Sequence, residues 1–298
     1  MKKSLRASTA VVLIMAATAM NSAAGIAAKD QAANVLDAYL EAFNQKDTAA
    51  WRATHHGGFF VVGPEGRIEV YEARDRIPPM FRSDEIKRVQ WQRAGWETRD
   101  VVQGSENKVH VQTRLTLYRE DGSRAWSQDA IYIITNTDGW AVAGVSTMPP
   151  VTYGPDGAPP PALSPDARAA LEKQAMRVLD EFMEAFNAQD EEAYLDTHNF
   201  PHLRLANEEF KLTGRDSTLF GRPFFFFLLK VSTGFKWDHS GWDQRIVAQA
   251  SPKKIHVLTR FSRYTEDNEK YGAYDSLYVL TREDGQWGVK GRSSFAPL

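Results

Sequence analysis

The segment from Thr197 to Leu205 combines residue types that can perform acid/base chemistry at a spacing that places them together. In an extended strand, alternation puts His198, His202 and Arg204 on one side and the two leucines on the other. A histidine that titrates near neutral pH beside a fixed cation can move a proton on a small organic substrate. A solvated strand face and hydrogen-bonded structural histidines are the alternatives to this hypothesis.

Further side chains of suitable chemistry lie later in the chain. We predict Tyr278 and Asp275 as additional catalytic residues, and Arg292, Phe224, Phe225, Trp242 and His55 as substrate-binding residues. Arg292 is a lone arginine near the end of the last strand, where it could hold an anionic or phenolic oxygen or simply be exposed. The phenylalanine run 224–227 predicts either core packing or an aromatic lid over a pocket.

The sequence does not support metal or cofactor chemistry. His55 and His56 are adjacent and point to opposite faces of a strand, and neither His-x-His nor Glu-x-x-His spacing occurs. The chain has no cysteine, no Gly-x-Ser-x-Gly elbow and no glycine loop of the phosphate-binding type. We therefore expect no metal and no cofactor.

The chain contains two copies of one module. Residues 35–55 and 178–198 are identical at 11 of 21 positions, including Glu-Ala-Phe-Asn and Thr-His. Residues 91–121 and 237–267 are identical at 15 of 31 positions, including both tryptophans. A repeat of about 145 residues is far longer than a solenoid repeat, so each copy is expected to be a domain.

The ends of these copies set the predicted domain boundaries. Residues 1–28 have a basic start, a short apolar run and small residues after it, which is typical of a secretory signal peptide cleaved after Ala24 or Ala28. We expect domains at 29–147 and 168–298. The segment 148–167 holds half of the prolines and is predicted to be a semi-stiff linker.

Within each copy, helical spacing comes first and alternating strands follow. Residues 35–43 and 178–186 show helical periodicity, and a short second helix is expected around Trp51 or Tyr194. Residues 108–118 and 254–264 alternate strictly before polar hairpin tips, and a final strand carries Trp140 or Trp287. This order predicts an α+β architecture.

At this point the chain resembles the nuclear-transport-factor-2-like superfamily, which includes ketosteroid isomerase, polyketide cyclases and scytalone dehydratase. The resemblance rests on the helix ending Glu-Ala-Phe-Asn-x-x-Asp, the tryptophan-bearing strand before a long hairpin, and the last strand Gln286–Lys290. It implies two cone-shaped antiparallel sheets, each wrapped on N-terminal helices and enclosing one apolar pocket. Such domains commonly dimerise through their sheets, which implies an internal pseudo-dimer and leaves further homo-oligomers open.

The resemblance also limits the chemistry that can be transferred. In ketosteroid isomerase the general base is a carboxylate, whereas no Asp or Glu occupies the strand 198–204. Scytalone dehydratase works without a cofactor through Tyr, His and Asp side chains. Each copy has those residue types at matching positions, with Asp129 and Tyr132 in the first copy corresponding to Asp275 and Tyr278 in the second.

Together these patterns predict an exported, cofactor-independent lyase, dehydratase or isomerase that acts on a hydrophobic aromatic or polycyclic molecule. The alternative is a non-catalytic ligand-binding or envelope-interaction module. The full chain carries a net charge of -2, and loss of Lys2, Lys3 and Arg6 with the leader gives -5. The absence of a basic run argues against nucleic-acid binding. The leader predicts a periplasmic or secreted protein with no membrane span after cleavage.

Overall fold

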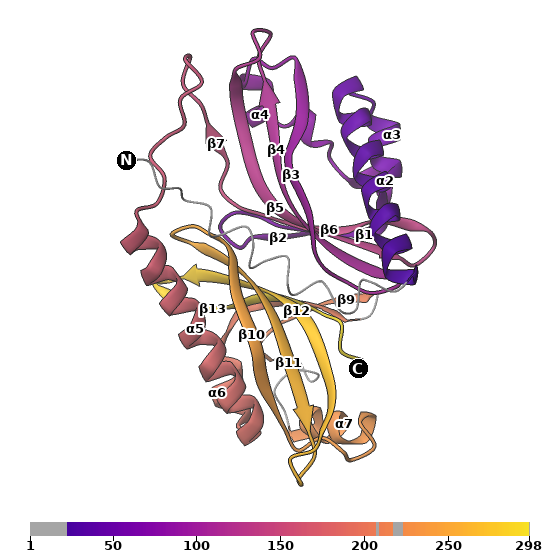
Figure 1. The fold of residues 1–298 in the computed structure, drawn as a ribbon, viewed down its shortest axis with the longest axis vertical. Coiled ribbons are helices and arrows are strands. Elements are labelled where there is room, and N and C mark those ends of the chain that lie inside the picture. The colour runs from indigo at the N-terminus through magenta and orange to yellow at the C-terminus, as the bar shows by residue number, and fades with distance from the viewer. Residues whose placement is uncertain (1–22, 207–208, 217–222, 298) are drawn as a thin grey trace. The chain divides into compact units, whose positions relative to one another are not determined.

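The computed structural model describes residues 23–206, 209–216 and 223–297 (Figure 1). The chain forms two compact units. The first comprises the described residues up to Gly63 and Glu69–Ala162, and the second comprises the described residues from Leu163 onward together with Pro64–Ile68. Each unit is a complete α+β domain with its own helices and sheet. The predicted fold class is therefore confirmed.

The first unit opens with a long helix, and its sheet is built mostly from later strands. Its elements are α2 (Ala23–Gln45), α3 (Thr48–Ala53), β1 (His55–Val62), β2 (Ile68–Tyr71), η1 (Arg74–Arg76), η2 (Met80–Arg82), α4 (Asp84–Arg88), β3 (Arg93–Gly104), β4 (Lys108–Tyr118), β5 (Arg124–Asn136), β6 (Trp140–Thr147) and β7 (Val151–Thr152). The strand order is β2-β1-β6-β5-β4-β3, and β7 adds to β5.

The second unit repeats this plan. Its elements are α5 (Pro165–Ala188), α6 (Glu191–Asp196), β8 (His198–Ala206), β9 (Glu209–Thr213), α7 (Pro223–Ser232), β10 (His239–Ala250), β11 (Lys254–Tyr264), β12 (Lys270–Glu283) and β13 (Gln286–Ser294). The strand order is β10-β11-β12-β13-β8-β9. The first unit has the shorter elements η1, η2 and α4 in the part of the chain that corresponds to helix α7.

The sheets differ in one respect from the prediction of antiparallel sheets. They are mixed, because β1 pairs with β6 and β8 pairs with β13 in the parallel sense. The parallel pairing arises because the strand after the helices returns beside the last strand of the meander. All other pairings within the two sheet paths that have a described register are antiparallel.

Local sequence explains where the helices begin. Ser164 caps α5 by accepting a hydrogen bond from the Ala167 amide, and Pro165 fills the first helical position, where no amide donor is needed. Asp47 and Asp190 cap α3 and α6 in the same way. The predicted linker 148–167 therefore includes the start of α5 as well as the strand β7.

The repeated Glu-Ala-Phe-Asn motif has a structural role that is the same in both units. Asn44 donates to the carbonyl of Ala94 at 3.2 Å and accepts from its amide at 2.6 Å. Asn187 makes the same two bonds to Ser240 at 2.8 and 2.9 Å. Each asparagine thus clamps the end of the long helix to the first part of the next long strand.

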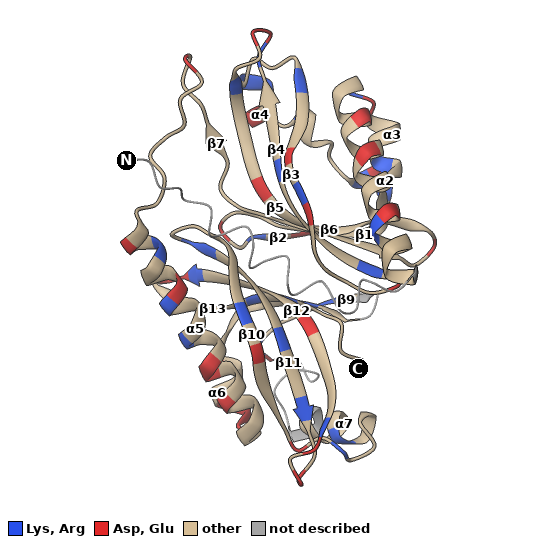
Figure 2. Ribbon diagram, in the orientation of Figure 1, with Lys and Arg blue, Asp and Glu red and all other residues tan. Residues whose placement is uncertain are grey.

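The helices pack on their sheets through apolar faces. In the first unit, Leu36, Tyr39 and Phe43 of α2 are buried against strands β3, β4 and β6. In the second unit, Val178, Leu179 and Phe182 of α5 form the corresponding core. Figure 2 shows both acidic and basic residues along α5. None of the described helices has the length and apolar character needed to cross a bilayer.

Strand β6 approaches its neighbour so closely at Gly144 that a larger residue should not fit. A Cβ atom there would lie 2.2 Å from the ring of Phe60, which is buried. We expect Gly144→Ala to lower the free energy of unfolding by about 1–3 kcal/mol in urea titrations. Gly95→Ala is the matched control, because its nearest neighbour is the Tyr118 ring at 3.4 Å. Equal effects of the two substitutions would contradict this packing.

Candidate functional site

A small cavity in the second unit brings together four of the ten predicted site residues, which are His198, His202, Arg204 and Arg292. Its volume is about 20 Å³, room for about one water molecule. The described residues that line it are Phe182, Phe186, Tyr194, His198, His202, Arg204, Leu229, Arg263, Arg292, Ser294 and Ala296. The cavity therefore joins α5, α6, β8, α7, β11 and β13.

The two histidines of the cavity lie in contact with each other and have defined tautomers. The rings of His198 and His202 are 4.7 Å apart and nearly perpendicular. Nδ1 of His198 lies 2.8 Å from the Tyr194 carbonyl, and Nδ1 of His202 lies 3.1 Å from the Val289 carbonyl. Because a carbonyl only accepts, both Nδ1 atoms must carry the proton. In the neutral rings, Nε2 is therefore the basic nitrogen.

Both imidazoles are neutral at ordinary pH. Burial lowers the pKa of His198 to about 3, and the Arg292 charge adds to this effect. Burial also holds the pKa of His202 well below its ordinary value, with a further contribution from His198. A neutral histidine can accept a proton, but these two are weak bases until a negative charge lies beside them.

Three arginines surround the histidines. Arg204 and Arg292 are register partners on the parallel strands β8 and β13, and Arg263 comes from β11. Burial, together with the Arg292 charge, lowers the pKa of Arg204 to about 10, so that it remains a cation at neutral pH. No Asp or Glu is found among the described residues that line the cavity.

Aromatic rings form the floor below Arg292. Its guanidinium lies 5.1 Å from the ring centres of Tyr278 and Phe261 and 6.0 Å from that of Phe182. Tyr278 is fully buried, and burial raises the pKa of its hydroxyl. Trp242 packs on Tyr278 at 5.6 Å and donates its indole hydrogen to the Leu179 carbonyl. Tyr278 and Trp242 therefore support the cavity from beneath.

Asp275 and His55 are not among the described residues that line the cavity. Asp275 is three residues from Tyr278 in β12, which places it on the opposite face of the sheet, where Arg260 donates to its carboxylate at 2.9 Å. His55 belongs to the first unit and bonds the Trp51 carbonyl at 2.9 Å, as His198 does with Tyr194. The side chains of Phe224 and Phe225 lie outside the described residues.

In the first unit, apolar residues occupy the positions that correspond to the cavity arginines and to His202. Val61 and Val145 are register partners, as Arg204 and Arg292 are in the second unit. By the same alignment, Phe59 replaces His202 and Leu117 replaces Arg263. In the first unit the corresponding space is thus filled by apolar side chains. Of the histidine and arginine positions of this cavity, only His198 has the same residue type in the first unit, which is His55.

Arg263 is the charged residue of the cavity that the sequence hypothesis did not include. It lies on a strand whose alternating pattern placed most charged side chains on the face away from the core. The signal was present in the duplication, because Arg263 aligns with the apolar Leu117 of the first copy. A search for positions that are aliphatic in one copy and cationic in the other identifies Arg204, Arg263 and Arg292 together.

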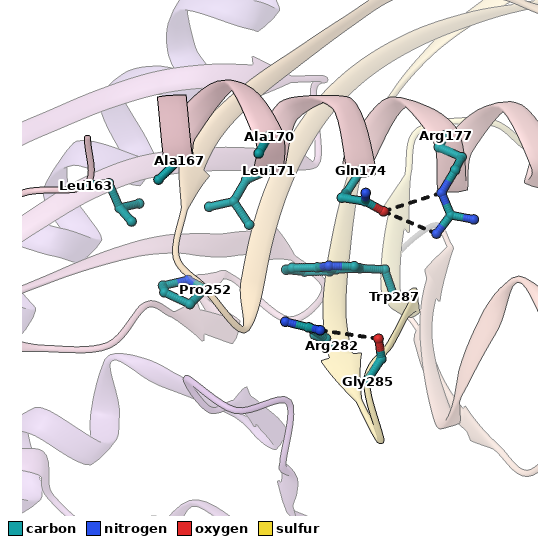
Figure 3. A pocket seen from close by; sticks show the side chains of 10 residues that line it. All are labelled: Leu163, Ala167, Ala170, Leu171, Gln174, Arg177, Pro252, Arg282, Gly285 and Trp287. Carbon is teal, nitrogen blue, oxygen red and sulfur yellow. Dashed lines mark hydrogen bonds between the residues drawn. The ribbon is translucent and has the colours of Figure 1, made fainter. Parts of the chain in front are cut away.

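A larger groove in the second unit lies along the first half of α5 and has a volume of about 470 Å³ (Figure 3). The ring of Trp287 lies in it between Gln174 and Arg282, and Arg282 donates to the Gly285 carbonyl. The groove is mostly apolar and holds no histidine or carboxylate that could exchange a proton. Across the described part of the chain, no three His, Asp or Glu side chains gather as metal ligands.

No family model matches this sequence, and no curated protein does. Solved structures are similar to one unit at a time. An NTF2-like protein of unknown function from Shewanella oneidensis has 16% identity, covers 42% of this chain and 98% of its own, and has a TM-score of 0.33. A scytalone dehydratase-like protein from Novosphingobium aromaticivorans has 12% identity, covers 45% and 89%, and has a TM-score of 0.34. Each of these two structures covers less than half of this chain.

A third similar structure comes from the same bacterium. It is described as an aromatic ring hydroxylase, with 10% identity, coverage of 44% of this chain and 91% of that chain, and a TM-score of 0.34.

Acidification should destabilise the second unit through His198. The folded-state pKa is about 3, whereas in the unfolded chain it is about 6.5. Between these values the unfolded state binds more protons, so the free energy of unfolding falls by about 1.4 kcal/mol per pH unit as the pH decreases. The stabilisation is complete above about pH 6.5 and is lost towards pH 3.

The comparison of His198→Gln with the wild type isolates this contribution. Between pH 6.5 and 5, the variant should lose about 2 kcal/mol less stability than the wild type in urea titrations. His239→Gln, at a partly exposed histidine stacked on Tyr264, should behave as the wild type does. An identical acid loss in His198→Gln would show that His198 is not buried in its neutral form.

Proposed function

We propose that the second unit uses its histidine–arginine cavity for cofactor-independent acid/base chemistry on a small hydrophobic molecule. The observation that carries this proposal is the contact between two neutral histidines, each with its proton fixed on Nδ1, inside a wall of arginines. Lyase, dehydratase and isomerase reactions share one requirement, which is removal of a proton while negative charge develops on an oxygen.

In this proposal His202 is the catalytic base. It has no counterpart in the first unit, whereas the bond of His198 to the helix before it is common to both units. When negative charge forms on the substrate oxygen, it offsets the repulsion between the arginines and a protonated imidazole. The basicity of His202 therefore rises as the reaction proceeds, which is the direction that stabilises the transition state.

A second candidate function is ligand binding without turnover. The low basicity of both histidines and the small volume of the cavity favour it. Binding and catalysis differ in one measurable respect, which is whether removal of the His202 imidazole abolishes proton transfer.

The elimination of 5-nitrobenzisoxazole tests this directly. A base removes the carbon-bound proton of the heterocycle, the N–O bond breaks, and the single product is 2-cyano-4-nitrophenolate, which is detected by its absorbance. We expect elimination to be catalysed by the full-length protein and to fall by about 100-fold in His202→Phe. Because Phe59 holds this place in the first unit, the melting temperature should stay close to that of the wild type.

Matched histidine variants complete the test. His239→Phe and His55→Phe should retain nearly all of the activity. The first residue is partly exposed, and the second lies in the unit where aliphatic residues replace the three cavity arginines. Loss of activity in His55→Phe alone would place the chemistry in the first unit. No elimination above the buffer rate by the wild-type protein would leave the binding function as the better account.

Export is a further part of the proposal and rests on the sequence of residues 1–28. Helix α2 begins at Ala23 and Ala28 is buried in its core, so that cleavage after Ala24 would keep more of this helix than cleavage after Ala28. We expect N-terminal sequencing of the protein from the envelope fraction to begin near Gly25. A mature protein that retains Met1 in the cytosol would contradict export.

A further inference from the structure

Three arginines line the cavity, and none of the described residues that line it is an Asp or Glu. Arg263 is 7% exposed, and its Nε is buried without a hydrogen-bond partner among the described residues. The Nε of Arg292 is in the same situation, and its described side-chain hydrogen bond, to Ser294, is long at 3.4 Å. Buried guanidinium groups of this kind are costly to leave unpaired.

The arrangement adds repulsion to the cost of burial. Arg204 and Arg292 face each other on neighbouring strands in register, where like charges destabilise a sheet. The fold does not require them, because the first unit builds the same strand pair with Val61 and Val145 and places Leu117 at the third position. A cluster that costs stability and is absent from the sister domain is best explained by a ligand that it binds.

The walls of the cavity indicate the form of that ligand. Phe182, Phe186 and Tyr194 supply aromatic surface, and the rings of Phe182 and Tyr194 are 5.1 Å apart. Guanidinium groups match a carboxylate in plane and charge, and they bind it through paired hydrogen bonds. We infer that the second unit binds the carboxylate of a small aromatic acid, with Arg204, Arg263 and Arg292 holding the anionic group.

This inference rests on the proposed function, because it assigns the ligand class of the same cavity. The present volume of about 20 Å³ is too small for an aromatic ring, so binding must move side chains of the wall apart. Electrostatic attraction between the anion and the three arginines supplies the free energy for that movement. A neutral molecule of the same shape has no such attraction and should not open the cavity.

The test uses benzoate and its neutral analogue benzamide as probes on the full-length protein. We expect benzoate to raise the melting temperature in a concentration-dependent manner and benzamide to leave it unchanged. In the triple variant Arg204→Val, Arg263→Leu, Arg292→Val, which reproduces the residue types of the first unit, the response to benzoate should disappear. Without ligand, this variant should melt about 3 °C or more above the wild type.

Two further variants separate the possible outcomes. Arg282→Val, in the groove of Figure 3, should keep the benzoate response and so exclude binding there. Arg292→Met changes one side chain only and should weaken benzoate binding at least tenfold. This single variant tests the inference even if the triple variant does not fold. An unchanged benzoate affinity in Arg292→Met would overturn the inference.

Other results would overturn it in different ways. A lower melting temperature of the triple variant would make the arginines structural, and an equal response to benzamide would remove the role of charge. A response to phenyl phosphate without one to benzoate would assign another anion. Benzoate binding by a protein without elimination activity would contradict only the acid/base proposal. Elimination without benzoate binding would contradict only the ligand class.

Discussion

The parallel pairing of β8 with β13 is the constraint on which the rest of the site depends. It joins the strand that follows the helices to the last strand of the meander, so residues nearly ninety positions apart become neighbours. Between His198 and Leu203 the pairing skips, since five steps along β8 match only two along β13. This irregularity lets His198 and His202 line one cavity with Arg204. The first unit has the same irregularity between His55 and Phe60.

The duplication separates what the fold needs from what the site adds. In both units a histidine bonds the carbonyl four residues before it, at the end of the short helix, and a threonine hydroxyl bonds that carbonyl too. These contacts are part of the scaffold. His202 and the three arginines occur in the second unit alone, and nothing in the described packing of the first unit calls for their charge.

Much of this fold could be predicted from local sequence, because helix ends, hairpin tips and alternation are local signals. The two copies, the α+β class and the positions of the short helices follow from such patterns, and so does the convergence of His198, His202 and Arg204. The parallel pairing of β1 with β6 and of β8 with β13 could not be predicted from local sequence, because it depends on which distant strands become neighbours. The separation of Asp275 from Tyr278 could have been foreseen, because an odd spacing in a strand places two side chains on opposite faces. Arg263 required comparison of the copies position by position.

The asparagine clamps at Asn44 and Asn187 have a consequence for how such a chain can change over time. Each clamp binds only main-chain atoms of the strand, so its strength does not depend on which side chain the strand carries there, Ala94 in one unit and Ser240 in the other. Substitutions along the strands can therefore accumulate without loosening the long helix. Evolution could convert an aliphatic lining into a cationic one in a single copy while the mechanical framework of both copies stayed the same.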